Sequence, residues 1–381
     1  MKAILGSMTA GLASHWRQWL RGWAQRPQEN GSGNAELNKL PAPLQARLQE
    51  AIERLPTPRG CRTTITEAVA EGLRHWRQQP QAGNVLVILA NPLEPLERYL
   101  SDALGNDALS AGGELQDCRL ITPLPADSRP KDPLTMADRM EEALNALPNP
   151  PIRGAEARED TTLVLIPALE MLILRCIGGW ESVELLRAEL VRRPDLFWVI
   201  GCNRWAWRFL DAVAGAEACF GTPIDLPGLA GEDLEPWLNA WLSGVEDLPV
   251  DPEQGADTFD WQELADLAKG VGSIAARLWL DGLRVGEESG LTATVPVLRS
   301  LPSLIGLDRY LLHAVLIHGR ISRAHLSSSL GETEGPVDVR SQWLLRQGIL
   351  EARGDILSIS PLYYRRVASE LANNNFFVES D

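Results

Sequence analysis

The sequence contains the run Val85-Leu86-Val87-Ile88-Leu89-Ala90, which follows Gly83-Asn84 and precedes a segment rich in Pro and Glu. A short apolar run without alternation is typical of a strand that is buried on both faces of a parallel sheet. Further segments that fit strands lie at 117–122, 161–166, 196–201 and 218–226. Helical periodicity separates them, and strands that alternate with helices predict a parallel α/β sheet.

The sequence after Pro227 changes to a helical periodicity that continues to about residue 284. It is interrupted at 244–260 by a stretch with six acidic and no basic residues, which is typical of a solvated loop. A last unit follows at 306–372, with three expected helices, a hairpin around Arg353-Gly354 and a closing helix. Three helices and a hairpin form a winged helix-turn-helix pattern.

These patterns divide the chain into four parts: an amphipathic helix and linker at 1–35, an α/β domain at 36–228, a helical lid at 229–300 and a winged-helix domain at 301–381. In the first part, one helical face carries Trp16, Trp19, Leu20 and Trp23. A helix of this kind on a flexible linker can dock on a membrane surface or in a groove of a partner. It can equally pack on its own domain.

The chain has 381 residues, 45% of them hydrophobic, and a formal net charge of −15. The hydrophobic fraction excludes wholesale disorder, and the acidic charge disfavours a general nucleic-acid-binding surface. Five cysteines without a CxxC pair favour a reducing compartment over a disulfide framework or a zinc ribbon. No apolar run reaches the roughly 18–20 residues of a membrane span, and the start of the chain makes a poor signal peptide. The sequence therefore predicts a cytoplasmic protein, with peripheral attachment to the inner membrane as an option.

Four segments carry a resemblance to a known family. They are Leu163-Val164-Leu165-Ile166-Pro167-Ala168-Leu169-Glu170, Phe197-Trp198-Val199-Ile200-Gly201-Cys202-Asn203, and the segments at 226–234 and 269–279. In this order they resemble the Walker B strand, the sensor-1 strand, the beginning of the lid and the sensor-2 region of AAA+ and related STAND P-loop ATPases. The resemblance covers about 65–372. It implies a nucleotide-binding α/β core, a helical lid and a winged helix, as in origin-recognition proteins.

The segment that should bind phosphate lacks the residues for it. A P-loop needs the pattern G-x-x-x-x-G-K-[ST], whose backbone N–H groups close around the phosphates. The first strand instead continues into Asn91-Pro92-Leu93-Glu94-Pro95-Leu96-Glu97, without Gly, Lys, Ser or Thr. Pro removes N–H donors and Glu repels phosphate. Pro167-Ala168 also replace the Walker B acids that would hold Mg²⁺. We therefore expect no ATP hydrolysis and no catalytic residue.

Weak nucleotide binding would have to use a degenerate pocket made of Asn91, Glu94, Glu170, Asn203 and Arg277. Each of these residues also fits an ordinary surface or salt-bridge role. The five histidines show no metal-binding spacing, and His318 and His325 are interpreted as helix-end or surface residues. We expect neither a cofactor nor a metal.

The contact surface expected of the winged helix consists of Arg320, Arg323, Arg340, Trp343 and Arg346. Residues 306–381 carry eight Arg against nine acidic residues, whereas a DNA-reading helix is expected to be basic. Charge therefore favours contact with a protein over contact with DNA.

The sequence as a whole predicts a non-enzymatic, ATPase-like scaffold or regulatory protein that binds a partner protein, with a membrane protein as one candidate. A winged-helix DNA-binding regulator and a divergent ATP-binding protein remain as alternatives, since one fold hosts many functions. The identity of the partner and the oligomeric state stay open, an oligomer included.

Overall fold

The computed structural model describes residues 40–79, 83–105, 115–116, 118–124, 129–130, 132, 135–148, 161–244, 259–285 and 291–376. These residues fall into two units. One contains 59–227 and 299–381, and the other contains the residues before 59 and 228–298. The predicted docking residues Trp16, Trp19, Leu20 and Trp23 lie outside the described residues. None of the helices within the described ranges is long and apolar enough to cross a membrane.

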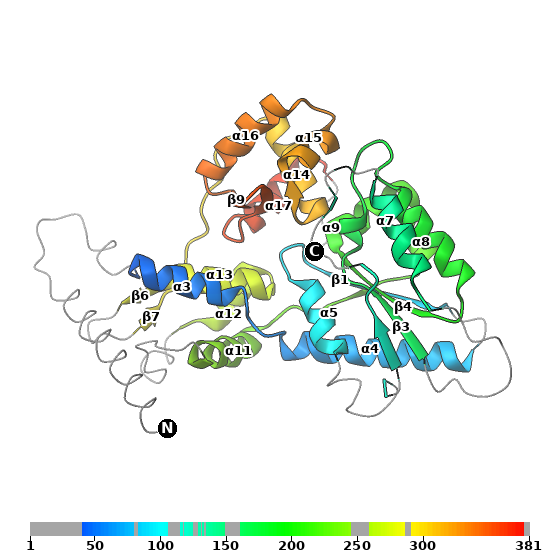
Figure 1. The fold of residues 1–381 in the computed structure, drawn as a ribbon. Coiled ribbons are helices and arrows are strands. Elements are labelled where there is room, and N and C mark those ends of the chain that lie inside the picture. The colour runs from blue at the N-terminus through cyan, green and yellow to red at the C-terminus, as the bar shows by residue number, and fades with distance from the viewer. Residues whose placement is uncertain are drawn as a thin grey trace, which may run out of the picture. The chain divides into compact units, whose positions relative to one another are not determined.

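A five-stranded parallel sheet forms the centre of the first unit (Figure 1). Its order is β2-β3-β4-β1-β5, so β4 and β1 are central. The strands are β1 (Val85–Ala90), β2 (Cys118–Ile121), β3 (Thr161–Ile166), β4 (Phe197–Asn203) and β5 (Ile224–Asp225). All seven residues of β4 are buried, as expected for a strand with neighbours and helices on both sides. The predicted parallel α/β core is confirmed.

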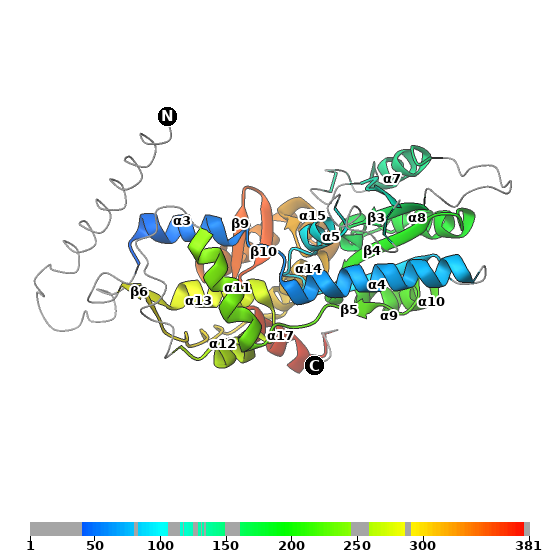
Figure 2. The ribbon, with the colours of Figure 1, turned by 90° about the horizontal axis from the view of Figure 1, so that it is seen from below.

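Successive residues of each strand enter opposite hydrophobic layers, because side chains alternate along a strand. Ile88, Leu165 and Val199 pack in one layer against α4 (Arg59–Gln78) and α5 (Leu96–Leu104). Val87, Val164 and Trp198 pack in the other layer against four further helices. These are α7 (Thr135–Asn145), α8 (Glu181–Arg192), α9 (Arg204–Ala214) and α10 (Ala216–Phe220). Helices α7 and α8 lie side by side in both views (Figures 1 and 2).

The segment expected to be a strand at 218–226 differs from the prediction. Residues Ala216–Phe220 form the short helix α10, and the strand β5 is limited to Ile224–Asp225. The apolar residues at 216–220 face the sheet from the helix, and a short apolar run does not distinguish a strand from one helical turn.

Residues 306–373 form a C-terminal domain within the same unit. Its helices are α14 (Gly306–His318), α15 (Arg323–Leu330), α16 (Glu334–Arg346) and α17 (Tyr364–Asn373). Strands β9 (Leu350–Arg353) and β10 (Ile356–Ile359) form the expected hairpin, and β8 (Ile321–Ser322) pairs with β10. The elements follow the predicted order, and the identification as a winged helix stays a prediction.

The second unit consists of helices that surround a core of Trp and Leu. They are α3 (Ala42–Ile52), α11 (Gly231–Gly244), α12 (Trp261–Ala268) and α13 (Gly272–Gly282), followed by the antiparallel strands β6 (Leu283–Val285) and β7 (Leu291–Ala293). The indole N–H groups of Trp237 and Trp241 donate to the carbonyls of Pro56 and Ala51. Helix α3 therefore belongs to the same unit as α11, α12 and α13, whereas the sequence prediction placed its residues with the α/β domain.

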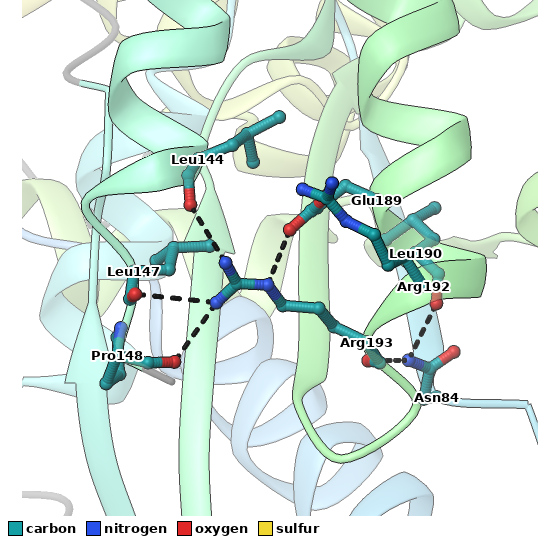
Figure 3. A network of polar contacts seen from close by, with 8 residues as sticks. All are labelled: Asn84, Leu144, Leu147, Pro148, Glu189, Leu190, Arg192 and Arg193. Atoms are coloured by element: carbon teal, nitrogen blue, oxygen red, sulfur yellow. Dashed lines mark hydrogen bonds and ion pairs between the residues drawn. The ribbon is translucent and has the colours of Figure 1, made fainter. Parts of the chain in front are cut away.

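A buried ion pair closes the amino-terminal edge of the sheet (Figure 3). Arg193 Nε lies 2.5 Å from Glu189 Oε1, and its Nη1 donates to the carbonyl of Pro148 at 3.0 Å. Asn84 Nδ2 donates to the carbonyls of Arg193 and Leu196, both at 3.0 Å. These bonds join the ends of α7 and α8 to the start of β1. The side chains at the amino-terminal edge of the sheet therefore stabilise the fold.

Candidate functional site at the carboxyl edge of the sheet

Backbone N–H groups of the loop after β1 donate hydrogen bonds to acceptors within the same loop. Asn91 Oδ1 accepts a hydrogen bond from the N–H of Leu93 at 3.1 Å, and the Asn91 carbonyl accepts from the N–H of Glu94 at 2.9 Å. The Leu96 N–H donates to the Glu94 carbonyl at 2.9 Å. A phosphate nest needs several N–H groups that point to a common centre. In this loop those groups are bonded internally, as expected from a segment with two prolines.

The carboxylate of Glu94 is also engaged. Its Oε2 accepts a hydrogen bond from the Tyr99 hydroxyl at 2.8 Å. Burial, together with the charge of Glu94, raises the pKa of Tyr99 well above its usual range. Glu94 thus bonds a side chain of the first turn of α5.

Asn91 meets the C-terminal domain. Its Nδ2 donates to the hydroxyl of Tyr364 at 2.7 Å, and Trp205 Nε1 donates to the same hydroxyl at 3.0 Å. Asn91 directly follows β1, Trp205 lies in the first turn of α9, and Tyr364 begins α17. The Tyr364 oxygen therefore lies where the carboxyl ends of β1 and β4 meet, the position at which open α/β sheets bind ligands.

Asn203, at the end of β4, uses three groups. Its Oδ1 accepts from the Ala206 N–H at 2.8 Å and so caps helix α9. Its Nδ2 donates to the carbonyl of Ile317, at the end of α14, at 3.0 Å. Its backbone N–H donates to Glu170 Oε2 at 3.2 Å. Asn203, which ends the strand that resembles sensor 1, and Glu170, which follows the strand that resembles Walker B, are therefore in contact with each other, and Asn203 also bonds the C-terminal domain.

Arg129 is the centre of this contact. Its Nε donates to the Ile173 carbonyl at 3.0 Å, its Nη1 donates to the Arg320 carbonyl at 2.6 Å, and its Nη2 donates to the carbonyls of Glu170 and His318. Burial lowers the pKa of Arg129 to about 10, although the nearby charge of Glu170 acts in the opposite direction. Burial also raises the pKa of the Glu170 carboxyl. Both charges are therefore costly at this edge and are held by hydrogen bonds.

His318, the last residue of α14, is fully buried beside this arginine. Its Nδ1 lies 3.4 Å from Arg129 Nη2 and its Nε2 lies 3.4 Å from Ser329 Oγ. Burial, followed by the charges of Arg129 and Arg175, lowers the pKa of His318 well below its usual range. Both His318 and His325 lie at helix ends, as one of the two predicted alternatives has it, but the surface alternative is wrong, since each is less than a tenth exposed.

The structure brings together four of the five residues of the predicted degenerate pocket: Asn91, Glu94, Glu170 and Asn203 lie at one edge of the sheet. Arg277 lies in α13, in the other unit. The sequence analysis missed Arg129, His318 and Tyr364, which complete the edge. Arg129 lies in a Pro-rich segment without periodicity, and its bonds go to backbone carbonyls that any sequence provides.

Two of the predicted winged-helix contact residues bond carboxylates. Arg320 Nη2 lies 3.0 Å from Glu97 Oε1. Arg340 donates through Nε and Nη2 to the buried carboxylate of Asp308, at 2.7 and 2.6 Å, and its guanidinium lies 4.4 Å from the centre of the Trp343 ring. Arg323 is half-buried and Arg346 is exposed. Among the described residues, no group of three or more His, Cys, Asp or Glu is placed to hold a metal ion.

A comparison with protein-family models gives no match, and a comparison with curated proteins gives none. Solved structures do match. Cdc6p from Pyrobaculum aerophilum has 12% sequence identity and a TM-score of 0.35, over 86% of this chain and 99% of that one. The Aeropyrum pernix ORC2 protein, in its ADPNP-ADP complexes, has 13% identity and a TM-score of 0.41, over 84% of this chain and 96% of that one.

The ORC1 protein of Aeropyrum pernix, in complex with DNA, has 14% identity and a TM-score of 0.37, over 87% of this chain and 98% of that one. At these identities no site, ligand or activity passes from them to this chain.

Proposed function

We propose that this chain is a non-catalytic protein with an AAA+-like core that serves as a scaffold or regulator and binds a partner protein. The observation that carries the proposal is the bonding of Asn91 and Asn203 to the C-terminal domain, at the edge where a nucleotide would bind. Side chains that satisfy one another across this edge are not available to a phosphate chain or to Mg²⁺. The absence of a P-loop pattern in the sequence supports the same proposal.

Calorimetric titration of the full-length protein with ATP and with ADP, each with and without Mg²⁺, tests the loss of nucleotide chemistry. We expect no heat of binding and no shift in melting temperature. Micromolar, Mg²⁺-dependent binding would contradict the proposal and favour a divergent ATP-binding protein. If binding occurs, the variant Asn203→Ala shows where the nucleotide binds. The affinity falls if the site lies at the carboxyl edge of the sheet, and it stays the same if the site lies elsewhere.

The segment at 1–26 is the proposed docking element, because the sequence predicts an amphipathic helix with a Trp-rich face there and a linker after it. The partner is a protein, with a membrane protein as one candidate. Full-length protein and a form without residues 1–26 would be compared by partner capture from detergent extracts and by flotation with anionic vesicles. A matched variant, Arg17→Gln with Arg21→Gln, keeps the Trp face and removes charge. Equal partner recovery and equal flotation with and without the helix would dismiss it as a docking element.

DNA binding is a second candidate, which is supported by the order of helices and hairpin in the C-terminal domain and by the exposed Arg346. The bonds of Arg320 and Arg340 to carboxylates reduce the charge available for phosphates. A gel-shift series at low and moderate salt with Arg346→Ala is the clean test. Arg340→Ala is unsuitable, because it would leave the fully buried Asp308 without this partner and so change stability. Absence of salt-sensitive binding would dismiss this candidate.

A further inference from the structure

The contact between the α/β core and the C-terminal domain is made by arginines that donate to the ends of helices. Arg129 donates to the carbonyl of His318, the last residue of α14, and to that of Arg320, two residues beyond the helix. Arg175 Nε donates at 3.2 Å to the carbonyl of Ser329, near the end of α15. The last carbonyls of a helix have no partner within the helix and carry the negative end of its dipole. Two helix ends are therefore capped by cations of another domain.

The same contact has apolar and polar parts, and in the apolar part the Trp205 ring lies edge-on to the His313 ring of α14, with centroids 6.0 Å apart. Among the residues that the structure describes, Ile317 of the C-terminal domain also packs in the hydrophobic layer between the sheet and α9. The polar part consists of the hydrogen bonds of Arg129, Arg175, Asn91, Trp205 and Asn203 and of the Arg320–Glu97 ion pair. Interfaces that are polar in this way resemble those of domains that move relative to each other more than they resemble a continuous core.

The contact also carries an electrostatic cost. The Arg129 guanidinium bonds carbonyl oxygens, and its pKa is lowered by burial. The neighbouring carboxylate of Glu170 is itself desolvated. A buried cation that bonds neutral acceptors recovers less of its hydration energy than one that bonds a carboxylate. The segment at 294–305, which leads into α14, contains no helix or strand.

From these contacts we infer that the C-terminal domain is a releasable cover, an intramolecular ligand that Arg129, Arg175 and Tyr364 hold over the carboxyl edge of the sheet. In the covered state Asn91, Glu170 and Asn203 are blocked. Release of the cover would leave the core folded and would expose these three residues together. Arg129 is a positioning residue in this device. The inference goes beyond the proposed function, because it concerns what occupies the edge and holds whether or not nucleotide binds.

Cys202 provides a native probe of the covered state. It lies in β4 next to Asn203, is fully buried, and packs in the same hydrophobic layer as Ile317. Burial raises the pKa of its thiol well above the usual range, so that it is protected from alkylation while the cover is closed. Cys61 and Cys118 are buried in the opposite layer and serve as internal controls.

The test is the rate at which N-ethylmaleimide labels each cysteine of the full-length protein under native conditions, measured by peptide mass spectrometry. Two variants are used. Tyr364→Phe keeps the aromatic ring and removes the hydroxyl that accepts from Asn91 and Trp205. Arg129→Lys keeps the positive charge and removes the guanidinium group with its several N–H donors. Arg187→Lys, in an ion pair on the surface of α8, is the matched control. We expect labelling of Cys202 to accelerate about tenfold or more in the two variants, with Cys61, Cys118 and the control variant unchanged.

Two results would overturn the inference. Equal acceleration at Cys202, Cys61 and Cys118 would mean global unfolding rather than release of one domain. An unchanged rate at Cys202 in Tyr364→Phe, the variant least disturbed in shape, would mean that the contact is a fixed part of the core. Neither result depends on the outcome of the calorimetric titration. The inference can therefore be overturned while the proposed function stands, and the reverse also holds.

Discussion

Asn91 Nδ2 donates to the hydroxyl of Tyr364 at 2.7 Å, although the two residues are 273 positions apart in the chain. Each of them is 4% exposed. The bond joins the end of the central strand β1 to the start of α17, and it takes the position at which a P-loop would begin. The carboxyl end of the sheet next to β1 is thus occupied by a contact within the molecule.

Tyr364→Phe should lower the free energy of unfolding by about 1–3 kcal/mol, because it leaves the Asn91 amide and the Trp205 indole N–H without their shared buried acceptor. Urea denaturation followed by tryptophan fluorescence measures the change. Tyr310→Phe is the control, since Tyr310 is 54% exposed and should change stability by less than about 0.5 kcal/mol. Equal effects of the two substitutions would show that the buried hydroxyl contributes no special stability.

Gly201 is required by the close approach of the chain after β3. A Cβ at this position would lie 2.4 Å from the Pro167 carbonyl oxygen and 2.6 Å from Leu100 Cδ1. Gly201→Ala should therefore cost at least about 2 kcal/mol of stability, since the first neighbour is backbone and cannot rotate away. Gly306→Ala, where nothing lies within 4 Å, should change stability by less than about 1 kcal/mol. Thermal melts of both variants measure the difference in stability. Similar melting temperatures of Gly201→Ala and Gly306→Ala would contradict the steric argument.

The core of the fold could be predicted from sequence because its signal is local. The strand expected at 161–166 is β3 as observed, since both faces of this strand are buried and every position is constrained. The helix expected at 307–318 is α14 to within one residue, because Gly319 ends it in a left-handed conformation. The strand β8 was missed because a strand of two residues has no periodicity.

The residues of the edge could be predicted only in part. Asn91 and Asn203 were found because they follow the apolar runs of β1 and β4, and parallel strands end on one edge. Arg129 and Tyr364 left no comparable signal, since their contacts depend on segments 41 to 273 residues away. The pairing of Arg340 with Asp308 was also not predicted, because the two residues lie 32 positions apart on different helices. Contacts between residues far apart in the chain cannot be read from the local pattern of the sequence.

His318 makes the stability of this unit depend on pH in a defined direction. Its pKa is lowered well below 6.5 by burial and by the charges of Arg129, Arg175, His325 and His313, so the folded state keeps it neutral where the unfolded state binds a proton. The stability that follows from this is present above pH 6.5 and is lost as the pH falls from there through the lowered pKa.

The raised pKa of Glu170 acts in the opposite direction, since its protonated form is favoured in the folded state. We therefore compare wild type with His318→Asn, which keeps an acceptor near Arg129, by thermal melts at pH 7.5 and 5.5. The drop in melting temperature between the two pH values should be smaller in the variant. An equal or larger drop would mean that another group controls the acid sensitivity.

The Arg193–Glu189 pair at the amino edge should be far more important to stability than the similar pair on the surface of the same helix. Glu189 is 3% exposed and faces Arg193, whereas Glu184 is 63% exposed and lies 2.8 Å from Arg187. Removal of one partner from a buried pair leaves an uncompensated charge, which costs about 3–5 kcal/mol. An exposed pair of this spacing contributes less than about 1 kcal/mol, because water screens both charges.

Glu189→Gln and Glu184→Gln are thus a matched test in one helix. Both variants remove one negative charge from α8 and keep a similar side-chain shape, so net charge and helix propensity change alike. Urea denaturation should show a large loss for Glu189→Gln, with the carbonyls of Leu147 and Pro148 no longer fixed by a positioned Arg193. The loss should persist in 1 M salt, since a buried pair is poorly screened. A small loss, or one that salt removes, would contradict the role of this pair as the closure of the sheet's amino edge.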